Sequence, residues 1–237
     1  MRRNAKETRS VIEYFEKESS LGTEFRRIYS NLKYYYSAQE LKTLLITSPS
    51  LGEGKTTMAS FLAIGIARWY GKNVVVLDCD LRKPSIHKFF DLNRDKGMTE
   101  ILSGKNRYLD CIKPTSIENL TIVTSGAEVD FPTKLLESQT FKGLLAEIRP
   151  HYDIIIADCA PVIPVNDALI LGTLLDGAIV VLKAGHSQRE VAKRAVELLR
   201  EAKVNLLGVV VNNMEDTFPY YYSYKYYGYD YSHQKKR

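Results

Sequence analysis

Short runs of apolar, mostly β-branched residues recur along the chain, and helical stretches separate them. The runs cover residues 44–47, 74–77, 120–123, 154–157, 178–182 and 207–211. Helices are predicted at 56–70, in short pieces between Pro84 and Gly104, at 135–148 and at 190–202. Runs that are apolar throughout are typical of parallel strands buried on both faces. We therefore predict an α/β fold, a parallel sheet sandwiched by helices, with its ligand site at the carboxyl ends of the strands.

The chain divides into three segments. Residues 1–40 are charged and carry apolar side chains at helical spacing, which predicts an N-terminal helical segment packed on the same domain. Residues 41–213 hold the alternating pattern, and 237 residues with 45% hydrophobic content are enough to bury a full core. Residues 214–237 lack this alternation of apolar runs and helical stretches, and we therefore predict that they form a flexible tail.

Composition excludes several classes of protein. A net charge of +5 without a dense basic stripe or a reading motif does not indicate nucleic-acid binding. The three cysteines, Cys79, Cys111 and Cys159, show no CxxC spacing, which favours buried, reduced thiols. No apolar run approaches the ~20 residues of a membrane-spanning helix. We expect a cytoplasmic protein, for which any association with the inner face of the membrane must come through a partner.

A glycine-containing loop lies between the first apolar run and the first long helix. It reads Thr47-Ser48-Pro49-Ser50-Leu51-Gly52-Glu53-Gly54-Lys55-Thr56-Thr57, and a strand before it and a helix after it are the context of a phosphate-binding loop (P-loop). Backbone N–H groups would surround the phosphates of ATP, Lys55 would reach the β and γ phosphates, and Thr56 would bind Mg²⁺. The expected nucleotide-binding residues are Gly52, Glu53, Gly54, Lys55, Thr56 and Thr57. Pro49 replaces the usual first glycine, and the alternative is a glycine-rich turn that binds nothing.

Carboxylates follow two of the other apolar runs. Asp78, Asp80 and Arg82 form a DxDxR element after 74–77, and Asp158 begins Asp-Cys-Ala-Pro after 154–157. In a parallel sheet these strand ends lie beside the P-loop, so the carboxylates are expected to converge on the γ-phosphate and its metal. We expect Thr56, Asp80 and Asp158 on the Mg²⁺ side. A single strand-end aspartate is more often a cap or turn former.

The tail is unusually rich in tyrosine. Eight of the twelve residues from 220 to 231 are tyrosines: Tyr220, Tyr221, Tyr222, Tyr224, Tyr226, Tyr227, Tyr229 and Tyr231. An aromatic low-complexity segment without enzymatic meaning is one interpretation. Beside an ATP site, the favoured interpretation is a set of phosphoacceptors.

Taken together, these elements resemble the bacterial tyrosine kinases of capsule and exopolysaccharide operons, whose P-loop fold is related to cell-division and partition ATPases. The resemblance runs from about Thr23 to the C-terminus and rests on the loop, the DxDxR element, Asp158-Cys159-Ala160-Pro161 and the tyrosine cluster. It is similar to the Gram-positive type, in which kinase and membrane adaptor are separate chains. The resemblance implies a protein-tyrosine kinase using ATP and Mg²⁺, with the catalytic residues Lys55, Asp78, Asp80, Arg82 and Asp158.

The same resemblance implies autophosphorylation of the tail between subunits, regulation of polysaccharide synthesis, activation by a membrane adaptor and reversal by a tyrosine phosphatase. Many family members carry an ExxRxxR motif that supports a ring. Here Arg26 fits the central position, but Thr23 and Tyr29 occupy the outer ones. Asn212 resembles an asparagine that contacts adenine, and a strand-terminating Asn is the equal alternative.

Individual roles follow from the chemistry of phosphoryl transfer, which needs mainly positioning and charge stabilisation. Asp78 is the candidate acceptor of the tyrosine proton, and Arg82 would steady the phosphates or a neighbouring acid. The alternative function is a non-kinase ATPase switch of the cell-division or partition type. Ser50 stands where those ATPases often carry a second lysine, and this favours the kinase.

Overall fold

The computed structural model describes residues 20–36 and 41–213. The tyrosine cluster and the first nineteen residues lie outside the described residues. The division into an N-terminal segment, a central domain and a flexible tail therefore stays a prediction.

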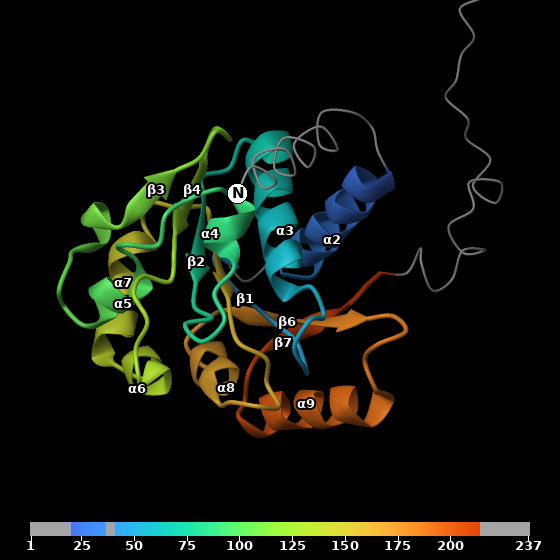
Figure 1. The fold of residues 1–237 in the computed structure, drawn as a ribbon. Helices are drawn as coiled ribbons and strands as arrows, with labels where there is room; N and C mark the ends of the chain where they lie inside the picture. Colours follow the sequence, from blue (N-terminus) through green and yellow to red (C-terminus); the bar gives the residue numbers. More distant parts are fainter. Residues whose placement is uncertain (1–19, 37–40, 214–237) are drawn as a thin grey trace, which may run out of the picture.

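A single mixed sheet forms the centre of the described chain (Figure 1). Its order is β3-β4-β2-β5-β1-β6-β7, and only the β3–β4 pair is antiparallel. The strands are β1 (Thr43–Thr47), β2 (Val74–Asp78), β3 (Ile112–Pro114), β4 (Leu120–Val123), β5 (Ile154–Asp158), β6 (Gly177–Lys183) and β7 (Leu206–Asn212). The predicted parallel sheet is confirmed, with β3 added at one edge.

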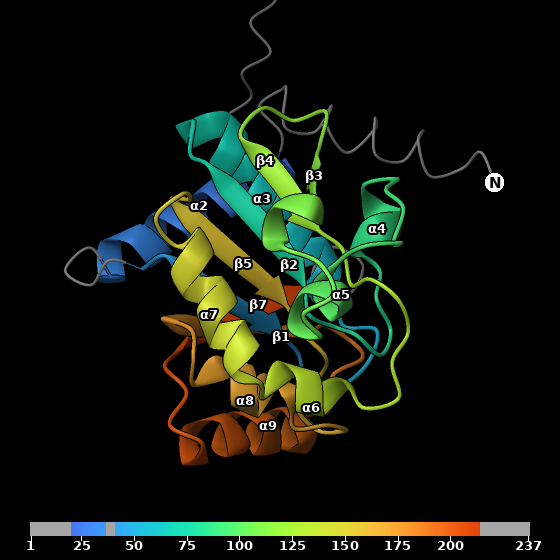
Figure 2. The same cartoon turned by 90° about the vertical axis from the view of Figure 1, so that its left-hand side faces the viewer.

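Helices cover both faces of the sheet, as Figures 1 and 2 show. One face carries α2 (Ser20–Tyr36), α3 (Lys55–Tyr70) and α4 (Ile86–Phe89). The other carries α5 (Met98–Leu102), α6 (Pro132–Leu136), α7 (Gln139–Ile148), α8 (Asp167–Gly172) and α9 (Arg189–Glu201). A short 3-10 turn, Tyr108–Asp110, precedes β3. Among the described residues, no helix combines the length and the apolar character needed to cross a bilayer.

Strand geometry explains why the apolar runs are continuous. Successive strand side chains point to opposite faces, so Leu44 and Ile46 of β1 join the core beneath α3, while Leu45 joins the core beneath the other helices. The same alternation places Val75 and Val76 of β2 in the cores on opposite faces of the sheet. Every residue of β1 and β2 is therefore buried.

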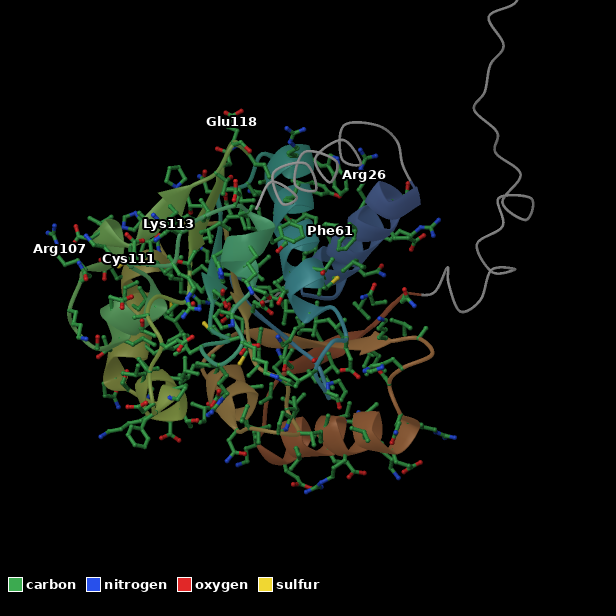
Figure 3. The ribbon with its side chains drawn as sticks, in the orientation of Figure 1. Arg26, Phe61, Arg107, Cys111, Lys113 and Glu118 are labelled. Atoms are coloured by element: carbon green, nitrogen blue, oxygen red, sulfur yellow. The ribbon has the colours of Figure 1, made fainter. Side chains whose placement is uncertain are left out.

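Aromatic contacts hold α2 against α3. The rings of Phe25 and Phe61 meet edge to face with centroids 5.5 Å apart, and the Arg26 guanidinium lies 4.6 Å from the centroid of the Trp69 ring. Figure 3 labels Arg26 and Phe61 where the two helices meet. Arg26, the residue that fits the ExxRxxR pattern, thus takes part in a cation–π contact within the chain.

The prediction of one helix over 135–148 is wrong. The structure has α6 and then α7, because Ser138 takes an extended backbone conformation (φ −66°, ψ 153°) and restarts the helix as an N-cap residue. The helices at 56–70 and 190–202 are confirmed to within one residue. All three cysteines are buried and unbridged, as predicted.

Candidate functional site

The P-loop connects the end of β1 to α3 and curls beneath a pocket of about 350 Å³. The pocket is lined by Leu51, Gly52, Gly54, Lys55, Thr56, Asp80, Lys83 and Ser85. Gly54, the residue before α3, has φ +93°, a left-handed conformation that side chains disfavour. A Cβ at Gly54 would also collide with the Asn212 amide. Glycine is thus required at the point where the loop turns into the helix.

Glu53 holds the loop in shape through its buried carboxylate. Oε2 accepts a hydrogen bond from the Ser50 backbone N–H at 3.0 Å, and Oε1 accepts one from the Ser187 hydroxyl at 2.5 Å. The Asn212 side-chain amide donates to the Glu53 carbonyl at 3.2 Å. Ser187, four residues after β6, and Asn212, the last residue of β7, therefore fix a loop that precedes them by more than 130 positions.

Lys55 begins α3 and points its ammonium at the DxDxR element. Its Nζ lies 2.7 Å from Oδ2 of Asp80, and both side chains are buried. Burial alone would lower the pKa of Lys55, but the carboxylates of Asp158 and Asp80 outweigh it and raise that pKa. The ammonium is therefore charged at neutral pH. Asp80 is also held by the Lys83 backbone N–H, which donates to Oδ1 at 2.9 Å.

Asp158 and Thr56 form the second part of the site. The Thr56 hydroxyl donates to Oδ2 of Asp158 at 2.6 Å and accepts from the Ser85 hydroxyl at 3.0 Å. Burial raises the pKa of Asp158 to about 6, against the lowering effects of the Lys55 charge and the Thr56 hydrogen bond. Oδ1 of Asp158 is buried and has no hydrogen-bond partner in the described structure.

Asp78 lies beside Asp158, because the two residues are register partners on the neighbouring parallel strands β2 and β5. Its side chain is fully buried; Oδ2 accepts from the Ile86 N–H at 3.3 Å, while Oδ1 has no partner among the described residues. Burial, followed by the charges of Asp158 and Asp80, raises the pKa of Asp78 well above its usual value. Asp78 does not line the pocket.

The donor set fits Mg²⁺. The cation prefers oxygen ligands and takes only one or two carboxylates, with waters and substrate phosphates completing the shell. Thr56 and Asp158 offer a hydroxyl and a buried carboxylate with an unpartnered oxygen beside the P-loop. Within the described residues no group of three or more His, Cys, Asp or Glu side chains forms a metal centre.

Arg82 lies away from the pocket, and its guanidinium contacts Asp167 and Thr133. Of the two roles expected for it, the structure shows contact with a neighbouring acid. Thr57, another expected nucleotide-binding residue, is exposed in the first turn of α3. Asn212 contacts the loop backbone, and both interpretations of it stay open. The eight tail tyrosines lie outside the described residues.

The structure adds site residues that the sequence did not single out. Lys83 and Ser85 line the pocket, Ser187 braces Glu53, and Asp167 and Thr133 hold Arg82. Lys83 and Ser85 lie within three residues after the DxDxR element, so their place in the sequence could have predicted that they line the pocket. Nothing local marks Ser187, Thr133 or Asp167.

Comparison with known proteins agrees with this geometry. An AAA domain family model matches residues 42–204. The chain is 34% identical over 226 residues to the tyrosine-protein kinase YwqD of Bacillus subtilis (strain 168), covering 95% of this chain and 94% of that protein. It superimposes on the crystal structure of the chimerical protein CapA2B2 with a TM-score of 0.82 at 31% identity, over 86% of this chain and 90% of the other.

A more distant likeness shows the fold alone. The Pyrococcus furiosus cell division ATPase MinD matches 72% of this chain and 71% of its own with a TM-score of 0.62 at 21% identity. This likeness confirms the predicted P-loop architecture and carries no evidence for the alternative ATPase-switch function. The chain belongs to the AAA domain family and, within it, to the bacterial tyrosine-protein kinases, so that it is an enzyme that phosphorylates tyrosine.

Proposed function

We propose that this kinase transfers the γ-phosphoryl group of ATP to tyrosines of its own C-terminal cluster, and that the transfer occurs between subunits. The observation that carries the proposal is the arrangement of Asp80 and Asp158 against the P-loop residues Lys55 and Thr56, in a chain whose residues 220–231 include eight tyrosines. The site has the charges that phosphoryl transfer needs, and the tail supplies acceptors in the same chain.

Lys55 and the backbone of the P-loop would hold the β and γ phosphates. Lys55 is buried at the base of the pocket and charged, so it would stabilise the negative charge that develops on the transferring group. Mg²⁺, when bound, would supply further positive charge that offsets the charge of the phosphates. Thr56 and Asp158 are the residues that would hold it.

In the transfer step, the tyrosine Oη attacks the γ phosphorus, and the bond from that phosphorus to the β–γ bridging oxygen breaks. The products are phosphotyrosine and ADP, and the phenol proton passes to a carboxylate. Asp78 is our candidate for this role because its Oδ1 is unpartnered among the described residues, whereas both oxygens of Asp80 already accept hydrogen bonds.

Partners and cellular place follow from the family. We propose that a membrane adaptor of the polysaccharide co-polymerase type recruits the chain from the cytoplasm to the inner face of the membrane. Phosphorylation of the tail would there regulate capsule or exopolysaccharide synthesis, and a tyrosine phosphatase would reverse it.

A mixing experiment tests both the site and the route of transfer. Lys55→Met keeps the tail but removes the phosphate-binding ammonium, and a chain ending at residue 213 keeps the site but lacks the acceptors. We expect no phosphotyrosine on either variant alone with Mg·ATP, and phosphotyrosine on the Lys55→Met chain when the two are mixed. Normal labelling of Lys55→Met alone would refute the site; no labelling in the mixture would refute transfer between subunits.

A further inference from the structure

A buried carboxylate outside the pocket, Asp167, holds the arginine of the DxDxR element. Asp167 is the first residue of α8 and is fully buried. Its Oδ2 accepts a hydrogen bond from Nε of Arg82 at 3.0 Å, and its Oδ1 accepts one from the Thr133 hydroxyl at 2.6 Å. The terminal Nη2 of Arg82 also donates to the Thr133 oxygen at 2.8 Å. The three side chains thus form a closed triangle of hydrogen bonds.

The triangle joins three segments that are far apart in sequence. Arg82 follows β2, Thr133 lies in the first turn of α6, and Asp167 begins α8. A buried carboxylate is costly unless its charge is paired and its oxygens accept hydrogen bonds. Here both oxygens are satisfied by Arg82 and Thr133, so the arrangement depends on all three members.

Arg82 lies in a short segment that carries pocket residues. Asp80 precedes it and contacts Lys55, and Lys83 follows it and lines the pocket. The Lys83 N–H donates back to Asp80, and Leu81 is buried between them. Fixing the guanidinium of Arg82 therefore fixes the backbone that presents Asp80 and Lys83 to the phosphates.

We propose that Asp167 is a positioning residue for phosphoryl transfer, which acts through Arg82 to hold Asp80 and Lys83 at the pocket, with Thr133 completing the link. In this proposal the arginine of the DxDxR element supports the backbone of the segment that carries Asp80 and Lys83, and it makes no contact with the phosphates. The inference rests on the proposed roles of Lys55 and Asp80 in the kinase site.

A double-mutant cycle tests whether Arg82 and Asp167 act together. Arg82→Ala, Asp167→Asn and the double variant are compared by kcat and KM for ATP, with a synthetic peptide of residues 218–231 as acceptor. ADP affinity and the unfolding midpoint are measured on the same proteins. Each single change is expected to lower kcat about tenfold, and the double variant to lose no more than either single one, because residues that act as a unit are non-additive.

ADP affinity separates positioning from direct contact. The P-loop and Lys55 do not contact Arg82, so the dissociation constant for ADP is expected to stay within about twofold in all three variants. Arg82→Lys retains the charge but lacks the fork that reaches two partners, and we expect it to restore part of the lost kcat. Losses that multiply in the double variant, a kcat unaffected by Asp167→Asn, or an ADP affinity that falls in step with kcat would each overturn the proposal.

The pair formed by Arg149 and Asp176 provides a matched control. It is also an arginine–aspartate contact, at 2.9 Å, but Asp176 binds the backbone at the start of β1, at the opposite end of the sheet from the pocket. Arg149→Ala is expected to lower the unfolding midpoint and leave kcat unchanged. If Asp167→Asn does not fold, Thr133→Val takes its place in the cycle with Arg82→Ala, and the same non-additivity is expected.

The outcomes also distinguish this inference from the proposed function. An unaltered chain that leaves the peptide without phosphotyrosine contradicts the proposed acceptor segment. An active chain in which Arg82 and Asp167 act independently contradicts the positioning role of Asp167 and leaves the proposed function intact.

Discussion

Asp158→Asn should make the protein more stable while abolishing its activity. Burial raises the pKa of Asp158 from an ordinary 3.8 to about 6. The folded state therefore binds this proton more tightly than the unfolded chain does, and stability falls as the pH rises between these values. At pH 7 the cost of the ionised carboxylate is about 3 kcal/mol, and at pH 5 it is about half of that.

Asparagine removes the cost of the buried charge and keeps the shape of the side chain. Its side-chain oxygen can still accept the hydrogen bond from the Thr56 hydroxyl. We expect Asp158→Asn to raise the free energy of unfolding by about 2–3 kcal/mol at pH 7, which corresponds to a rise of about 5–10 °C in Tm for a domain of this size. Without the carboxylate the variant should bind Mg²⁺ poorly and form no phosphotyrosine.

Urea unfolding at pH 7 and pH 5, without nucleotide or Mg²⁺, measures the effect. The gap between Asp158→Asn and the unaltered chain should shrink by about half at pH 5. Asp176→Asn is a control for which the change in stability should have the opposite sign. Burial would raise the pKa of Asp176, but hydrogen bonds from Arg149 and from the backbone of Lys42 and Thr43 lower it, so that variant should be less stable at pH 7. A less stable Asp158→Asn, or a gap independent of pH, would refute the reasoning.

Three further predictions concern the loop and the tail. Gly54→Ala should lower ATP affinity and cost about 1–2 kcal/mol of stability, because a left-handed backbone and the Asn212 amide both oppose a Cβ; titration with ATP and thermal unfolding check it. Ser187→Ala should cost about 1–3 kcal/mol and raise the KM for ATP, because it removes one hydrogen bond from the buried Glu53 carboxylate; an unchanged KM would show that this brace is dispensable. Phosphorylation of residues 220–231 should reduce self-association, because each phosphotyrosine adds about −1.5 to −2 charges to a chain of net +5; equal masses of both forms by light scattering would contradict this.

The central strands and the P-loop were predictable because their signals are local. A short continuous apolar run rich in β-branched residues favours a parallel strand, and the loop between β1 and α3 keeps its spacing whatever surrounds it. Asp78, Asp80 and Asp158 were placed together by the same logic, since parallel strands end at one edge of the sheet. The sequence supplies these elements without any knowledge of distant contacts.

What the sequence missed depends on contacts between distant segments. β3 is three residues long and ends in proline, so it has no alternation to detect and exists only through its antiparallel pairing with β4. The turn at Ser138 that divides α6 from α7 lies inside a continuous helical pattern. Asp167 and Thr133 look like ordinary helix-start residues, and only the folded chain brings them to Arg82.

Charge balance explains why these carboxylates both oppose folding and suit the proposed reaction. Lys55 supplies one positive charge among Asp78, Asp80 and Asp158, so the fully ionised cluster carries an excess of two negative charges. Burial and the neighbouring carboxylates raise the pKa values of Asp78 and Asp158, and a divalent cation would neutralise the excess negative charge without protonation. A neutral phenol can enter such a site, but phosphotyrosine leaves it with almost two negative charges of its own. The carboxylates that destabilise the fold would therefore attract the metal before transfer and repel the modified tail afterwards.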